Sequence, residues 1–160
     1  MTQVCLVGSE DVNLRYELLS RETAREALST YDLREPFENA VGIETVSIGA
    51  AVSLLNDLNW YLVRFVDRAL VRDDSVSDAE WLSRDLAAAI RDGDVTPEES
   101  QRFLTVYGLV EPADSEERDP PKRLVEPMYV TRTGPDVPEY DLRDVEETLV
   151  VRVTEGEFGA

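Results

Sequence analysis

The stretch AVSLLNDLNWYLVRFVDRA, residues 51–69, decides the fold of this chain. Its apolar side chains recur every three or four residues, a spacing that only an α-helix places on one face. The stripe consists of Ala51, Leu55, Leu58, Leu62, Phe65 and Ala69. Further apolar residues widen this stripe around most of the helix, so we expect the helix to contact a sheet and other helices at the same time. It is predicted to form the centre of the core.

Two strands and a helix are predicted before this segment. Residues 3–7 form a short apolar run that predicts a first strand, and alternation over residues 43–48 predicts a second. Between them, the spacing of apolar residues predicts a helix within residues 12–31. The first half of that helix is ambiguous, because its apolar residues also alternate as they would in a strand.

Two more helices are predicted after the central one. Ser77-Asp78-Ala79-Glu80 has the pattern of a capping box, in which the serine accepts from a backbone amide and the glutamate reaches back to the serine. This motif predicts a helix over residues 77–91, and Gly93 is well placed to end it in a left-handed conformation. Thr96-Pro97-Glu98-Glu99 has similar chemistry and predicts a third helix over residues 97–107.

The C-terminal third begins with residues 111–127, where four prolines stand among charged residues, so we expect an acidic, proline-rich linker. Residues 128–132 and 148–153 predict two strands of a C-terminal β-hairpin within residues 128–158. The predicted organisation is an α+β core of residues 1–110, the linker, and the hairpin as part of the same domain. The predicted fold class is α+β, with three to four helices packed on a small mixed or antiparallel sheet.

The charge of the chain is strongly negative. It has 34 acidic and 16 basic residues, a net charge of −18, and a single lysine among the basic residues. The acids are interleaved with apolar residues, which predicts a folded body with an acidic surface. At molar salt the Debye length is about 3 Å, so self-repulsion is largely screened. This composition is typical of proteins from halophilic cells; the alternative is an acidic protein from a GC-rich bacterium.

The composition excludes several kinds of chemistry. The chain contains no histidine, which removes serine-histidine and cysteine-histidine catalysis and metal sites built on imidazole. The single cysteine, Cys5, excludes an internal disulfide and a Cys-x-x-Cys redox pair and fits a reducing compartment. We expect no cofactor, no metal and no membrane segment, and we expect a cytoplasmic location because the N-terminus lacks the features of a signal peptide.

The candidate binding residues are Asn56, Asp57, Asn59 and Arg64, which interrupt the otherwise apolar central helix. Polar side chains within a buried element need partners, so we predict a pocket for a small ligand or a contact with a partner protein. The alternative is that the four residues mark the solvent edge of the helix or cap a neighbouring loop. No catalytic, cofactor-binding or metal-ligating residue is predicted.

Three classes of function remain open. The composition favours a non-enzymatic binding module that uses the acidic linker and the C-terminal hairpin as a surface for a protein partner. The predicted order of two helices followed by a hairpin also fits a winged helix-turn-helix regulator. Nucleic-acid binding is disfavoured, because residues 97–104 of the would-be recognition helix carry two acids and one arginine. A small enzyme that uses carboxylates and arginine is the third class, and it would gather Asp57 and Arg64 in a cleft.

Two segments carry a resemblance to a known family. DVNLRYELLS, residues 11–20, and SLLNDLNWY, residues 53–61, resemble a family of uncharacterised proteins from halophilic archaea. The resemblance covers roughly residues 1–110. The family has no assigned activity, so the resemblance implies no activity, ligand or functional residue, and the oligomeric state also stays open.

Overall fold

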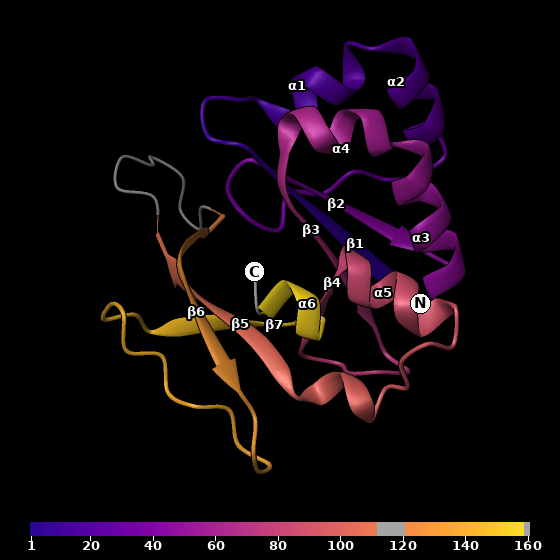
Figure 1. Cartoon of the computed structure of the whole chain (residues 1–160). Helices are drawn as coiled ribbons and strands as arrows, with labels where there is room; N and C mark the ends of the chain where they lie inside the picture. Colours follow the sequence, from indigo (N-terminus) through magenta and orange to yellow (C-terminus); the bar gives the residue numbers. More distant parts are fainter. Residues whose placement is uncertain (112–120, 159–160) are drawn as a thin grey trace.

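A seven-stranded sheet with the order β2-β1-β3-β4-β7-β5-β6 forms the centre of the computed structural model, which describes residues 1–111 and 121–158 (Figure 1). Neighbouring strands are antiparallel except for β4 and β7, which run parallel. The α+β class is confirmed. The sheet is larger than expected, and the described residues form six α-helices where three to four were predicted.

The N-terminal strand organises the first half of the sheet. β1 (Thr2–Gly8) lies between β2 (Ala40–Thr45) and β3 (Val66–Asp73) and is antiparallel to both. The strand predicted at residues 3–7 is therefore confirmed, and the second strand begins three residues earlier than predicted. Ser47, which was expected inside that strand, instead caps the next helix by accepting a hydrogen bond from the backbone amide of Ala50.

The central segment folds as two helices and the start of a strand, so the prediction of one helix up to Ala69 is wrong. α3 (Ile48–Asp57) ends at Leu58, which leaves the helical conformation, and α4 (Asn59–Phe65) follows at once. The apolar stripe of both helices is buried in the core as predicted. The chain becomes extended at Val66 because the following residues pair with β1, continuously from Arg68 to Asp73 after a register shift at Asp67, and this pairing outweighs their helical spacing.

Two short helices replace the single helix predicted within residues 12–31. α1 (Leu14–Leu19) is capped by Asn13, whose side chain accepts from the backbone amide of Tyr16, and α2 (Glu22–Leu28) begins after Arg21. Both helices bury two apolar residues each against the core.

The helix predicted over residues 77–91 is shorter than expected. Ser77 does accept hydrogen bonds from the amides of Ala79 and Glu80, but the chain then enters strand β4 (Trp81–Ser83). The helix that follows is α5 (Arg84–Arg91), with Ser83 as its N-cap. Gly93 has φ +80° after this helix, as predicted.

The third helix predicted over residues 97–107 is wrong. A single 3₁₀ turn spans Glu99–Gln101, and the chain then forms β5 (Phe103–Val110), which pairs with a strand on each side. Five of the eight residues of β5 are aromatic or β-branched, and pairing on both edges favours the strand over a helix. The winged helix-turn-helix interpretation loses its recognition helix as a result.

The two C-terminal strands do not form a hairpin with each other. β6 (Arg123–Thr131) and β7 (Glu147–Arg152) both pair with β5, which lies between them, and the short helix α6 (Glu155–Phe158) follows. Most of the predicted linker, residues 112–120, lies outside the described residues. Its last residues belong to β6 instead.

The two faces of the sheet are covered differently (Figure 1). α1 to α5 pack on one face and form the larger apolar core. The other face carries a smaller cluster around Leu70, Trp81 and Tyr107, onto which Phe37 and the α6 residue Phe158 pack. None of the helices in the described residues is long and apolar enough to cross a membrane.

Candidate binding cleft on the second face of the sheet

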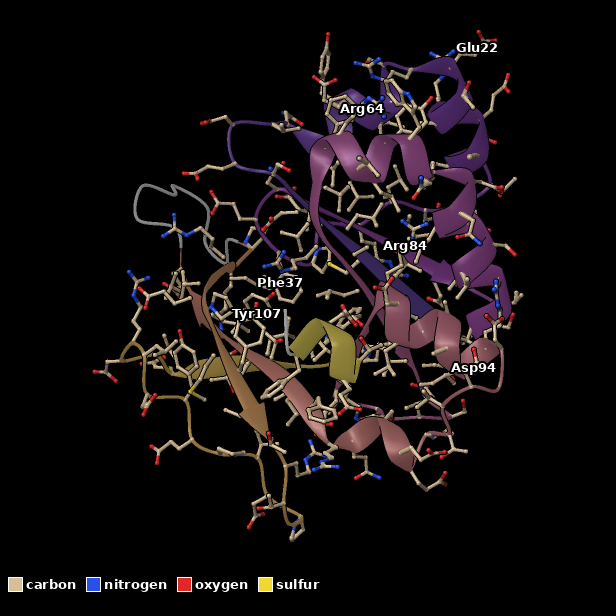
Figure 2. The ribbon with its side chains drawn as sticks, in the orientation of Figure 1. Glu22, Phe37, Arg64, Arg84, Asp94 and Tyr107 are labelled. Carbon is tan, nitrogen blue, oxygen red and sulfur yellow. The ribbon has the colours of Figure 1, made fainter. Side chains whose placement is uncertain are left out.

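The second face of the sheet is concave. Arg68 on β3 donates a hydrogen bond from Nε to the hydroxyl of Tyr107 on β5 over 2.5 Å. β4 and β7 separate these two strands in the sheet, and three strand spacings in a flat sheet would amount to about 14 Å. The sheet therefore curls so that Arg68 and Tyr107 meet across its hollow side, and Tyr107 lies well inside the molecule in Figure 2.

Two cavities meet at this contact, and together we call them the central cleft. The first has a volume of about 440 Å³ and lies between α4, β3, β5 and α6. The second has a volume of about 520 Å³ and lies between the loop after β1 and the start of β6. Both are lined by Asp67, Arg68 and Tyr107.

The short strand β4 opens the first cavity. β3 pairs with β4 only at Leu70 and Val71, because the chain turns into α5 immediately after Ser83. The preceding residues of β3, from Val66 to Ala69, have a strand neighbour on the β1 side but not on the β4 side. The gap between this part of β3 and the end of β7 is the space that the cavity occupies.

Two of the three guanidinium nitrogens of Arg68 are hydrogen-bonded to described residues, and the third is not. Nε donates to Tyr107, and Nη1 donates to the backbone carbonyl of Asp67 over 2.9 Å and lies 3.6 Å from its carboxylate. Burial lowers the pKa of Arg68, but the hydrogen bond and charge interactions with Tyr107 and the charge of Asp67 outweigh it, so the pKa is raised. Nη2 has no acceptor among the described residues.

The hydroxyl of Tyr107 accepts one hydrogen bond but donates none to a described residue. Burial raises the pKa of Tyr107, and the hydrogen bond from Arg68 lowers it by less, so the hydroxyl keeps its proton. An arginine can only donate, so the oxygen of Tyr107 accepts and its own proton points elsewhere. No described residue accepts that proton.

A serine and a glutamate in the first cavity form a close pair that is structural. The Ser83 hydroxyl donates to Glu157 over 2.6 Å and accepts from the amide of Leu86 as the N-cap of α5. Glu157 also accepts from the amide of Thr154, whose side chain accepts in return, which is a capping box for α6. The pair thereby joins the starts of two helices, and these caps account for its hydrogen bonds.

The four predicted binding residues are all exposed, and none of them lines the two cavities of the cleft. Asn56 and Asn59 both accept from Arg84, over 3.2 and 2.8 Å. Arg84 lines the first cavity, so these two asparagines position a residue at its rim. Figure 2 shows Arg84 near the start of α5.

The other two predicted residues lie apart from this pair. Arg64 donates to the carbonyl of Trp60 and stacks on its ring at 3.8 Å, at the outer tip of α4 in Figure 2. Asp57 is exposed at the end of α3. The structure does not bring Asp57 and Arg64 into one cleft with the other charges.

Arg68 and Tyr107 were not predicted as site residues, because the apolar spacing around both predicts helices. The signal that would have found Arg68 is its spacing with Arg72: in a strand both arginines share one face with Leu70, while the apolar Ala69 and Val71 lie on the other. Among the described residues, no three His, Cys, Asp or Glu side chains gather in a way that would hold a metal ion.

Comparison with protein families identifies the family of this chain. The profile of a family of unknown function, DUF5804, matches residues 2–109, about two thirds of the chain. Neither the curated proteins nor the solved structures gave a match. The expected relation to a family without an assigned activity is confirmed, and halophilic origin stays a prediction. The chain belongs to the DUF5804 family of unknown function.

Proposed function

We propose that this chain is a non-enzymatic binding module of a salt-rich cytoplasm and that its ligand occupies the central cleft. The observation that carries the proposal is the meeting of two cavities at Arg68 and Tyr107, where hydrogen-bond donors of both side chains remain unused. Sites for small ligands are concave and combine apolar walls with a few directed polar groups, and the first cavity of the cleft combines both kinds of lining.

Binding is favoured over catalysis by the partners of the polar residues in the cleft. Ser83 and Glu157 form the one hydroxyl-carboxylate pair in the described lining of the cleft, and both are occupied in capping helices. A nucleophile needs a base that is free to take its proton, and these caps leave neither side chain free. The proposal therefore assigns Arg68 and Tyr107 to recognition.

A salt-rich environment is supported by the charge distribution. A net charge of −18 on 160 residues produces strong self-repulsion in dilute buffer. The described ion pairs are mostly exposed, and exposed pairs add little stability. High ionic strength therefore stabilises this chain by screening repulsion more than it weakens the attractive pairs.

The test is a fragment screen of the full chain in molar potassium chloride, followed by amide and side-chain NMR. We expect the fragments that bind to shift the resonances of Arg68, Tyr107 and Tyr129, and we expect Arg68→Gln to remove these shifts. Arg91→Gln makes the same change in charge at an arginine on α5 that pairs with Asp92, and it serves as the control. Fragments that bind only at other surfaces would overturn the proposal.

A further inference from the structure

The unused donors in the cleft point to a particular ligand chemistry. Arg68 and Tyr107 are already hydrogen-bonded to each other. The two donors, Nη2 of Arg68 and the hydroxyl of Tyr107, therefore lie close together in a fixed arrangement. Thr105 adds a third polar group, since its residue is 4% exposed, lines the first cavity and makes no side-chain hydrogen bond to a described residue. Donors that face a cavity and have no acceptor among the described residues are matched by a group that only accepts.

The charge of the first cavity decides between the anions that such donors bind. Arg68 and Arg84 line it together with Asp67, Asp85 and Glu157, so the carboxylates outnumber the guanidinium groups. Arg84 is also occupied, because its two terminal nitrogens donate to Asn59, Asn56 and the carbonyl of Leu55. A ligand with a single negative charge is repelled less by these carboxylates than a doubly charged phosphate, and one partly neutralised arginine provides one charge-assisted contact for it.

The apolar wall of the same cavity indicates a ligand with a hydrophobic body. Val63 is 73% exposed and Tyr129 is 52% exposed, and both line the cavity beside the more buried Leu62 and Val66. They are among the few large apolar side chains that the described surface leaves exposed. Covering them would remove apolar area from water at the point where an acceptor group would reach Arg68.

Resting on the binding function proposed above, we propose that the central cleft binds a monocarboxylate with an aromatic or branched aliphatic body. The carboxylate oxygens accept from Arg68 Nη2 and from the Tyr107 hydroxyl, and the body lies against Val63 and Tyr129. The carboxylate belongs either to a small organic acid or to the C-terminus of a peptide, because β3 leaves the edge of residues 66–69 open beside Arg68.

The experiment titrates the full chain in molar potassium chloride with matched probes and follows the guanidinium signal of Arg68 and the ring signals of Tyr107 by NMR. Phenylacetate is compared with phenylacetamide, phenylethylamine and inorganic phosphate. An N-acetylated tripeptide with a free C-terminus is compared with its C-terminal amide. We expect the carboxylates to bind at least about tenfold more tightly than the matched amides, the difference that one charge-assisted hydrogen bond provides. The tighter of the two carboxylates identifies the source.

Two variants and two controls test the residues. Arg68→Gln and Tyr107→Phe should each weaken carboxylate binding about tenfold, because each removes one donor to a charged acceptor. Arg91→Gln and Tyr16→Phe alter the same residue types on the exposed surface and should leave the affinity unchanged. Urea midpoints of all four variants check that each one is folded.

The outcomes separate this inference from the proposed function. If the amide, the amine or phosphate shifts the cleft resonances at least as strongly as the carboxylates, the carboxylate inference is wrong and the binding function stands. If no probe shifts these resonances, both are overturned. If carboxylates bind equally well to Arg68→Gln, the assignment of Arg68 is overturned.

Discussion

Replacing Glu80 by glutamine should destabilise the fold by about 3 kcal/mol, because Glu80 joins two buried guanidinium groups. Its carboxylate accepts from Arg132 Nη2 over 2.6 Å and from Arg152 Nε over 2.7 Å. The side chains of these arginines are only 8% and 7% exposed, and Arg152 also donates to Ser100. The three charges connect the residue after β6, the last residue of β7 and the residue before β4.

The expected loss in stability comes from the guanidinium group that glutamine leaves without a carboxylate partner. Removing one partner of a buried ion pair costs about 3–5 kcal/mol, since the remaining charge is uncompensated. Glutamine keeps one acceptor but turns an amide group with two donors toward the second guanidinium. Arg132 would then retain only a long contact with Gln101 at 3.4 Å, and its Nε is already without a partner among the described residues. Glu80 is 19% exposed, and water reaching it places the cost at the lower end of the range.

The assay is urea unfolding in molar potassium chloride, followed by far-UV circular dichroism. Glu26→Gln, on the exposed side of α2, makes the same chemical change and should stay within about 0.5 kcal/mol of the parent. A loss below about 1 kcal/mol for Glu80→Gln, or one equal to that of Glu26→Gln, would refute the reasoning.

The same variant has a pH signature. Burial raises the pKa of Glu80, but the hydrogen bonds and charges of Arg132 and Arg152 lower it by more, so the folded-state pKa lies below the ordinary 4.5. The stabilisation is therefore complete above about pH 4.5 and is lost as the pH falls through the folded-state pKa. Glu80→Gln lacks this component, so its stability should fall less steeply with acid than that of the parent.

Three further predictions concern the surface, the core and a helix cap. Dialysis into dilute buffer should abolish the far-UV helical signal, because the repulsion within a chain of net charge −18 is then unscreened; an unchanged cooperative fold would contradict this. Cys5 is buried and burial raises its pKa to about 12, so at molar salt it should resist iodoacetamide until urea unfolds the chain, and alkylation of the folded chain at the rate of a free thiol would be the opposite result. Ser83→Ala removes the N-cap of α5 and the donor to Glu157, so it should lower the free energy of unfolding by about 1–2 kcal/mol and speed amide exchange in α6. Unchanged exchange in α6 would show that this helix does not depend on the Ser83–Glu157 hydrogen bond.

The parts of the fold that sequence analysis predicted are those set by local signals. The first strand is a short apolar run, and the stripe through α3 and α4 is buried because side chains at helical spacing must share a face. Gly93 ends α5 with positive φ because a glycine has no steric penalty there.

The parts that were wrong depend on partners distant in the sequence. Residues 66–69 and 103–107 have helical spacing, yet both segments are strands because β1, β6 and β7 offer them ladders. The capping box at Ser77 is a similar case. The hydrogen bonds to the Ser77 hydroxyl form, but the Glu80 carboxylate accepts from two arginines more than fifty residues away in the sequence, so no helix begins there. Local chemistry cannot indicate such partners.

The candidate site could not be predicted from the sequence for the same reason. In the structure, Arg68 differs from Arg72, although both occupy equivalent positions on one face of β3. Arg68 and Arg72 both point from β3 to the concave face, on either side of the buried Leu70. Arg72 stacks on Trp81 at 4.8 Å, so it covers an aromatic ring of the smaller core, and packing explains its presence. Arg68 lies farther from the ring of Tyr107, at 6.0 Å from its centre, and its partners are the hydroxyl of Tyr107 and the backbone carbonyl and carboxylate of Asp67. It lies where β4 has ended. Packing on an aromatic ring therefore accounts for less of Arg68 than of Arg72, and the acceptor that we propose for the free Nη2 of Arg68 is the ligand of the central cleft.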